Sequence, residues 1–235
     1  MRLVLLPGLD GTGELFADFV AALPSWIEST VVSFPSDEFL SYSELQSVVA
    51  AIFPQTESFF LLAESFSTPL AITVVAHAPR NLLGAILVAG FSRDPARSRL
   101  LAKLASHPAF FKIPTPSAML RFFLAGWDAD RAFIRNIQRV IRQVRPEVLS
   151  GRVREVLNCD VRADLPRIKV PLLCIRAENE NLLRRECGNE ILSGNRNATL
   201  ENVSSPHMIL QRAPERSVEL VAGFIRQHRP QTAVE

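Results

Sequence analysis

The sequence predicts an α/β fold with a doubly wound, mainly parallel six-stranded sheet and helices on both faces. Most of the six short runs predicted as strands are apolar along nearly their whole length, which is typical of strands buried on both faces of a parallel sheet. Segments of helical length and periodicity separate most of these runs, and this alternation predicts right-handed crossovers that bring the carboxyl ends of the strands to one edge. The predicted strands are 2–6, 30–34, 58–63, 83–89, 170–176 and 198–203.

The helices are predicted from apolar residues that recur every three or four positions. Pro24 follows the first helix and ends it, and Pro69 is acceptable in the third because it lies in the first turn. About 80 mainly helical residues separate the fourth and fifth strands, which is too long for a simple crossover. The predicted helices outside this segment are about 15–23, 43–52, 66–77, 182–188 and 214–227.

Length and composition indicate an ordinary globular protein. A chain of 235 residues suits a single α/β domain with an insertion, and 48% hydrophobic with 21% charged residues excludes disordered and collagen-like classes. The apolar run at residues 1–8 is too short for a signal peptide and no stretch is long enough to span a membrane, so we expect a soluble, cytoplasmic protein. Cys159, Cys174 and Cys187 are irregularly spaced, which favours free thiols over disulfides or a zinc site.

A candidate nucleophile stands at the end of the third predicted strand. The run Leu61 to Ser67 reads LLAESFS, in which an apolar strand stops at Ser65 and a helical pattern begins directly after it. A strand that turns sharply into a helix at a serine exposes the hydroxyl above the carboxyl edge of the sheet. Ala63 and Ser67 occupy the two flanking positions where glycine is usual, so the short motif needs support from other residues.

A serine nucleophile needs a base, and the chain has four histidines. His77 ends a predicted helix, His107 lies in the long helical segment and His228 lies in the polar tail. His207 follows the sixth strand by a few residues, at the edge where Ser65 emerges. We therefore expect His207 to be the base.

The carboxylate that would orient the histidine is assigned from a resemblance to a known family. The residues after the fifth strand, Ala177 to Leu183, read AENENLL and resemble the loop of the α/β-hydrolase family that commonly reads Gly-x-x-Asp-x-Leu-Val. Aligned on Leu182 and Leu183, the triad acid falls on Glu180, with Glu178 and Asp94 as alternatives. The order serine, acid, histidine is also that of α/β-hydrolases. The resemblance covers nearly the whole chain.

Two further features follow from this resemblance. The run Leu5 to Gly13, LLPGLDGTG, resembles the oxyanion loop of the family, and the N–H groups of Leu9 and Phe66 are then expected to bind the developing oxyanion. Residues 92–157 correspond to a helical cap, or lid, inserted before the fifth predicted strand, and residues 1–91 and 158–235 to the core of a single domain. We expect the cap to decide substrate choice, and it contains an apolar set, Phe110, Phe111, Met119, Leu120, Phe122, Phe123 and Trp127.

Charge is distributed unevenly along the chain. Residues 1–90 carry 2 basic and 9 acidic side chains, residues 91–154 carry 13 and 4, and residues 155–235 carry 11 and 11. Four arginines recur at helical spacing beside an apolar stripe, at positions 131, 135, 139 and 142. Such a face is either simply solvated or attracts an anionic or carrier-bound substrate.

The predicted function is hydrolysis of a carboxylic ester or thioester through an acyl-serine intermediate, with no cofactor, metal or nucleic acid. Acyl transfer and carbon–carbon bond hydrolysis need the same triad, and a non-catalytic binding protein on the same fold is the alternative outside enzymes. Dinucleotide binding is disfavoured because Phe16 stands where the glycine-rich fingerprint needs a third small residue.

Overall fold

The computed structural model describes residues 1–77 and 79–230, and in these ranges the predicted α/β architecture is confirmed. All six strands are parallel, in the order β2-β1-β3-β4-β5-β6. The strands are β1 (Arg2–Leu6), β2 (Glu28–Val31), β3 (Phe59–Glu64), β4 (Leu82–Val88), β5 (Leu172–Ala177) and β6 (Ala198–Val203).

The helices are α1 (Ala17–Ala22), α2 (Tyr42–Ile52), α3 (Ser67–Ala76), α4 (Arg99–Ala105), α5 (Ala109–Lys112), α6 (Ser117–Leu120), α7 (Arg131–Arg142), α8 (Pro146–Asn158), α9 (Cys187–Gly194), α10 (Ile209–Arg212) and α11 (Pro214–His228), with η1 (Glu14–Phe16), η2 (Arg121–Ala125) and η3 (Leu165–Arg167). None of the helices in the described ranges is both long and apolar enough to cross a bilayer.

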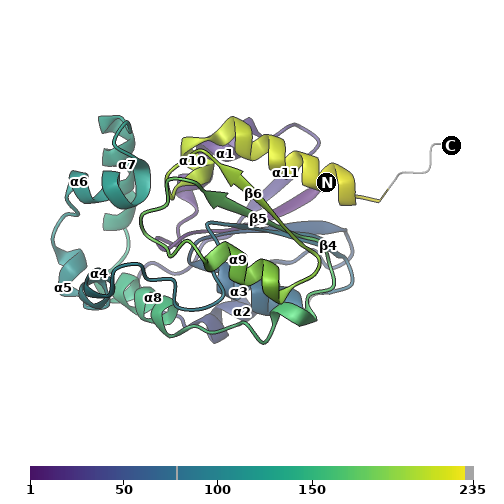
Figure 1. The fold of residues 1–235 in the computed structure, drawn as a ribbon, viewed down its shortest axis with the longest axis horizontal. Helices are drawn as coiled ribbons and strands as arrows, with labels where there is room; N and C mark the ends of the chain where they lie inside the picture. The colour runs from purple at the N-terminus through teal and green to yellow at the C-terminus, as the bar shows by residue number, and fades with distance from the viewer. Residues whose placement is uncertain (78, 231–235) are drawn as a thin grey trace.

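Helices cover both faces of the sheet, as Figure 1 shows, with α1 and α11 on one side and α2, α3 and α9 on the other. Alternation along the strands produces two cores. Leu3 and Leu5 of β1 belong to the core that includes Phe224 of α11, whereas Val4 and Leu6 belong to the core that includes α2 and α3. The central strands are therefore buried on both faces, which is why they read as continuous apolar runs, whereas the edge strands β2 and β6 are more exposed.

The long segment between β4 and β5 contains α4 to α8, and α4 to α7 gather to the left of the sheet in Figure 1. Its apolar set is divided between two environments. Phe110, Phe111, Met119, Leu120 and Phe123 line a cavity, whereas Phe122 and Trp127 are exposed.

Several elements differ in their boundaries from the prediction. The second strand is shifted from 30–34 to Glu28–Val31, because its register is set by pairing with β1. Helix α2 is capped by Ser41 and Glu44, whose side chains satisfy each other's backbone N–H groups, so the helix begins before Ser43. The prediction missed α10 altogether.

The predicted helix at 182–188 is wrong in position. The N–H groups of Leu182 and Leu183 donate to the Glu180 carboxylate, and Leu183 forms a bridge with Ala96. The carbonyl of Leu182 accepts from the N–H of Arg97, and the N–H of Arg184 donates to the carbonyl of Pro95. This stretch therefore pairs with the chain after β4, and α9 begins only at Cys187. The apolar pair reflects packing against a cavity rather than helical periodicity.

Candidate active site

Ser65 lies in the turn between β3 and α3, with a backbone φ of 47°. A non-glycine residue with positive φ is uncommon and is kept only where the surroundings hold it. Here the N–H of Ser65 donates to the carbonyl of Val88, at 2.8 Å, and its carbonyl accepts from the N–H and hydroxyl of Thr68. The turn therefore presents the hydroxyl in one fixed direction.

The structure gives a reason for Ser67 where glycine is usual. Its side chain is completely buried, and its hydroxyl donates to the carbonyl of Pro7 in the loop after β1. Ser67 thus joins the turn that carries Ser65 to the loop predicted to bind the oxyanion. A glycine could not form this link.

His207 lies in the loop after β6 and contacts both predicted partners. Its Nε2 is 3.0 Å from Ser65 Oγ, and its Nδ1 is 2.7 Å from Glu180 Oε2. The side chain is buried. The other three histidines lie elsewhere: His77 binds the carbonyl of Thr73, His107 accepts from the N–H of Ala109, and His228 packs on Phe224.

Glu180 is held on its other side by backbone donors. Its Oε1 accepts from the N–H of Leu182 at 2.7 Å and from that of Leu183 at 3.2 Å. Burial opposes the charged form of Glu180, but His207 and these two donors outweigh it and lower the pKa of the carboxyl. Burial likewise opposes protonation of His207, but the carboxylates of Glu180 and Glu64 raise its pKa above the ordinary value.

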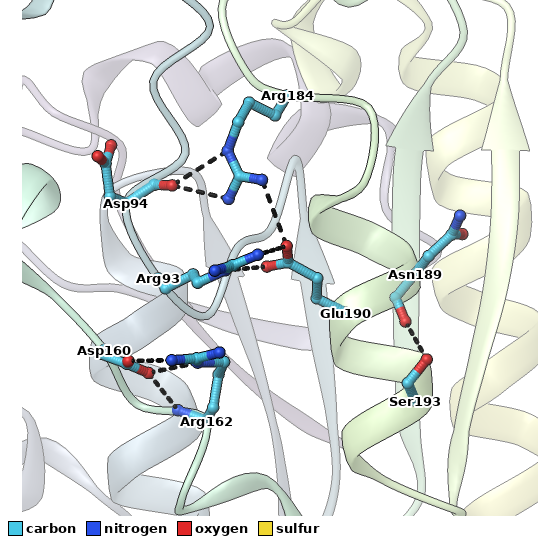
Figure 2. A network of polar contacts seen from close by, with 8 residues as sticks. All are labelled: Arg93, Asp94, Asp160, Arg162, Arg184, Asn189, Glu190 and Ser193. Atoms are coloured by element: carbon cyan, nitrogen blue, oxygen red, sulfur yellow. Dashed lines mark hydrogen bonds and ion pairs between the residues drawn. The ribbon is translucent and has the colours of Figure 1, made fainter. Parts of the chain in front are cut away.

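The two alternative acids do not contact His207 in the described structure. Glu178 is exposed. The Asp94 carboxylate accepts from the N–H of Ala96 and pairs with Arg99, while its backbone carbonyl accepts from Arg184 in the network of Figure 2. In that network Arg93 and Arg184 both bind Glu190 of α9, so Asp94 belongs to a set of contacts that joins the chain after β4 to α9.

Leu9 and Phe66 lie beside Ser65 in the wall of one cavity. Within the described residues, neither backbone N–H donates to another protein group. Both are thus available for a ligand oxygen, although their assignment to an oxyanion hole stays a prediction.

The cavity has a volume of about 220 Å³ and lies between the sheet edge and residues of α4 to α8. Ser65 is in its wall, together with Leu9, Phe66 and Phe91 from the core. The helical side is almost entirely apolar and consists of Leu101, Ala102, Ala105, Phe110, Phe111, Met119, Leu120, Phe123, Leu124, Ile141, Val153, Val156 and Leu157.

Two groups near the site were missed by sequence reasoning. Arg152 of α8 is buried and donates to the carbonyls of Leu9, Asp10 and Pro35 at 3.0, 2.6 and 2.8 Å. It is one of 13 basic residues in its part of the chain, and no local pattern distinguishes it.

Glu64 is the second missed group and directly precedes Ser65. Its buried carboxyl accepts from Gln211, and burial raises the pKa of Glu64 to about 7. A glutamate ending an otherwise apolar strand was the available signal.

Comparison with known proteins gives similarity in structure alone. No family model and no curated protein matches the sequence. A bromoperoxidase from Bacillus anthracis superposes with a TM-score of 0.83 at 14% identity, covering 96% of this chain and 91% of that one. An enol-lactonase from Burkholderia xenovorans superposes with a TM-score of 0.81 at 16% identity, covering 96% of this chain and 91% of that one. An alpha/beta hydrolase enzyme from a deep-sea metagenome library superposes with a TM-score of 0.78 at 14% identity, covering 99% of this chain and 92% of that one. At these identities the likeness establishes a shared architecture and no particular activity.

Proposed function

We propose that this chain, which has the α/β-hydrolase fold, is a serine hydrolase that cleaves a carboxylic ester or thioester. The observation that carries the proposal is the continuous contact from Ser65 Oγ to His207 Nε2, at 3.0 Å, and from His207 Nδ1 to Glu180 Oε2, at 2.7 Å. A serine, a histidine and a carboxylate in this order constitute an activated nucleophile. The adjoining cavity supplies a place for substrate.

In the first half of the proposed reaction, Ser65 Oγ attacks the carbonyl carbon while its proton passes to His207 Nε2. The negative charge that develops on the carbonyl oxygen is bound by the N–H groups of Leu9 and Phe66. Glu180 stabilises the imidazolium and holds the ring in orientation. His207 then gives its proton to the leaving alcohol or thiol, and the acyl group remains on Ser65.

In the second half, a water molecule attacks the acyl carbon and gives one proton to His207 Nε2. The second tetrahedral intermediate collapses, the carboxylic acid leaves, and the proton returns to Ser65 Oγ. Acyl transfer differs only in that another nucleophile replaces water.

The test is labelling with a fluorophosphonate probe, followed by peptide mapping. We expect the wild type to be labelled at Ser65 and the Ser65→Ala variant to remain unlabelled. Ser98→Ala is the matched control, since Ser98 also lines the cavity and its variant should still be labelled at Ser65. A folded Ser65→Ala variant that hydrolyses p-nitrophenyl acetate at the wild-type rate would exclude the proposal and leave a binding protein as the alternative.

A further inference from the structure

The described wall of the cavity beside Ser65 has almost no charged side chains. Among the described residues that line it, Arg97 has the only charged side chain. Arg97 is itself exposed, and its Nη1 donates to the carbonyl of Glu180 at 2.9 Å. The hydroxyl of Ser98 is also engaged, because it accepts from the N–H of Leu101 at the start of α4. The remaining wall offers a ligand mainly carbon atoms.

The size of the cavity limits what fits inside. A dry apolar cavity of about 150 Å³ binds benzene, which has six non-hydrogen atoms. By the same proportion, the 220 Å³ cavity holds about nine non-hydrogen atoms of a bound chain. The wall also includes Ser65 together with Leu9 and Phe66, so one end of a bound chain lies at the proposed reaction centre.

We propose that the substrate carries an uncharged apolar chain, of which about eight to ten carbons bind in this cavity. The inference rests on the proposed function for the reaction, but the chain length and the absence of charge come from the cavity walls alone. A carboxylate placed among the apolar residues of the helical side would lose its hydration without a cation beside it, because the one charged residue of the described wall, Arg97, is solvent-exposed and precedes α4. A chain that carries its charge into the helical side is therefore disfavoured.

Helix α4 supplies the residues that determine chain length. Ala102 and Ala105 are three positions apart, line the cavity, and present the smallest side chains of its helical side. Leu104 is 52% exposed and is absent from the cavity wall. One helix thus offers two positions for filling the cavity and one for a control.

The experiment compares kcat/KM for p-nitrophenyl esters from acetate to myristate. With the wild type, we expect a rise of about fourfold per added methylene up to eight to ten carbons and no rise beyond, because each buried methylene contributes a constant increment. A second series uses acetate esters of alcohols of increasing chain length. Comparing the two series shows whether the cavity binds the acyl chain or the alcohol chain. A flat profile in both series, with hydrolysis that still depends on Ser65, would overturn the inference and leave the proposed function intact.

Variants of α4 test the assignment of the wall. Ala102→Phe places an additional ring in the cavity, and we expect it to lower the ratio of octanoate to acetate kcat/KM by at least about 60-fold, equivalent to three methylenes. Ala105→Phe is the second variant, in case the first does not fold. Leu104→Phe should leave the ratio unchanged. Equal ratios in all three variants would contradict the assignment.

A binding measurement keeps the inference testable without turnover. Decan-1-ol should raise the Tm of Ser65→Ala, and Ala102→Phe in the same background should abolish the shift.

The monoester of an eight-carbon diacid should be hydrolysed at least about 100-fold less efficiently than octanoate, because its free carboxylate is buried unpaired. Equal rates for the two esters would show that the chain does not enter the cavity.

Discussion

The buried carboxyl of Glu64 accepts a hydrogen bond from Gln211 Nε2 at 3.3 Å, while Gln211 Oε1 has no partner within the described residues. A protonated carboxyl resolves this mismatch, since it can donate to the amide oxygen and accept from the amide nitrogen at once. Burial is the largest influence on Glu64 and raises its pKa to about 7; Asp10 adds to the rise, whereas Gln211 and His207 oppose it. Glu64 therefore titrates near neutrality, one residue from Ser65.

The first prediction concerns stability and pH. Because the pKa of Glu64 is about 7 in the folded protein and about 4.3 in the unfolded chain, the folded state binds more protons between these values. The resulting stabilisation, at most about 4 kcal/mol, is fully present below pH 4 and is lost as the pH rises through 7. We expect Glu64→Gln to be more stable than the wild type at pH 8.5, measured by urea denaturation.

The control for this prediction is Glu38→Gln, since Glu38 is exposed. The difference between Glu64→Gln and the wild type should grow between pH 5 and 8.5, and that between Glu38→Gln and the wild type should not. A constant difference for Glu64→Gln would mean that Glu64 is ionised throughout this range.

The second prediction separates the two candidate acids. Glu180→Gln should lower kcat on the order of 10⁴-fold with little change in KM, because a neutral amide cannot stabilise the imidazolium of His207. Glu178→Gln should change kcat by less than about twofold, because Glu178 is exposed and does not contact His207 in the described structure. Steady-state kinetics on p-nitrophenyl acetate measures both. The opposite ranking would place the acid two residues earlier.

The third prediction concerns Arg152. Arg152→Met leaves three carbonyls without a donor, and each buried unpaired acceptor costs about 1–3 kcal/mol, so we expect a loss of about 3–5 kcal/mol in the free energy of unfolding. Arg154→Met is the matched control, because Arg154 is exposed on the same helix and should change stability by less than about 0.5 kcal/mol. Equal midpoints in urea for the two variants would show that Arg152 contributes no more than a surface residue.

The fourth prediction tests the arginine face of α7. Arg131, Arg135, Arg139 and Arg142 are exposed, and Arg139 pairs with Glu14 at 2.8 Å. If this face attracts an anionic leaving group or carrier, kcat/KM for an anionic acyl thioester should fall between about 0.01 and 0.5 M salt, as the Debye length shrinks from about 30 Å to a few ångströms. Efficiency on a neutral ester should stay nearly constant.

Substituting Arg135 and Arg139 by glutamate should flatten the salt curve of the thioester. Parallel curves for the two substrates in the wild type would show that the arginines are only a solvated face.

Sequence reasoning succeeded where one local signal fixed one structural feature. The run Leu61 to Ser67 ends a strand at Ser65 because the apolar pattern and the start of α3 both place the turn there. The proximity of Ser65, Glu180 and His207 followed from parallel topology, which brings the ends of β3, β5 and β6 to one edge. Their catalytic roles stay predictions.

Sequence reasoning failed where the deciding contact joins distant residues. The helix expected at 182–188 competes with the pairing of Leu182 to Arg184 with the chain after β4, and no periodicity reveals that competition. The pairing of Glu64 with Gln211 spans 147 positions. The apolar residues of the long helical segment could be counted, but which of them face a cavity and which face solvent depends on how α4 to α8 pack.

The anchoring of α8 by Arg152 has a consequence for access to the cavity. Arg152 and Glu155 bind α8 to the loop after β1 and to the start of α2, whereas α4 and α5 have no buried side chain among their described residues. Moving α8 would break buried polar contacts, but displacing α4 and α5 would not. Displacing α4 and α5 is therefore the least costly way to widen access to the cavity, and the loop of Leu9 can stay in place meanwhile.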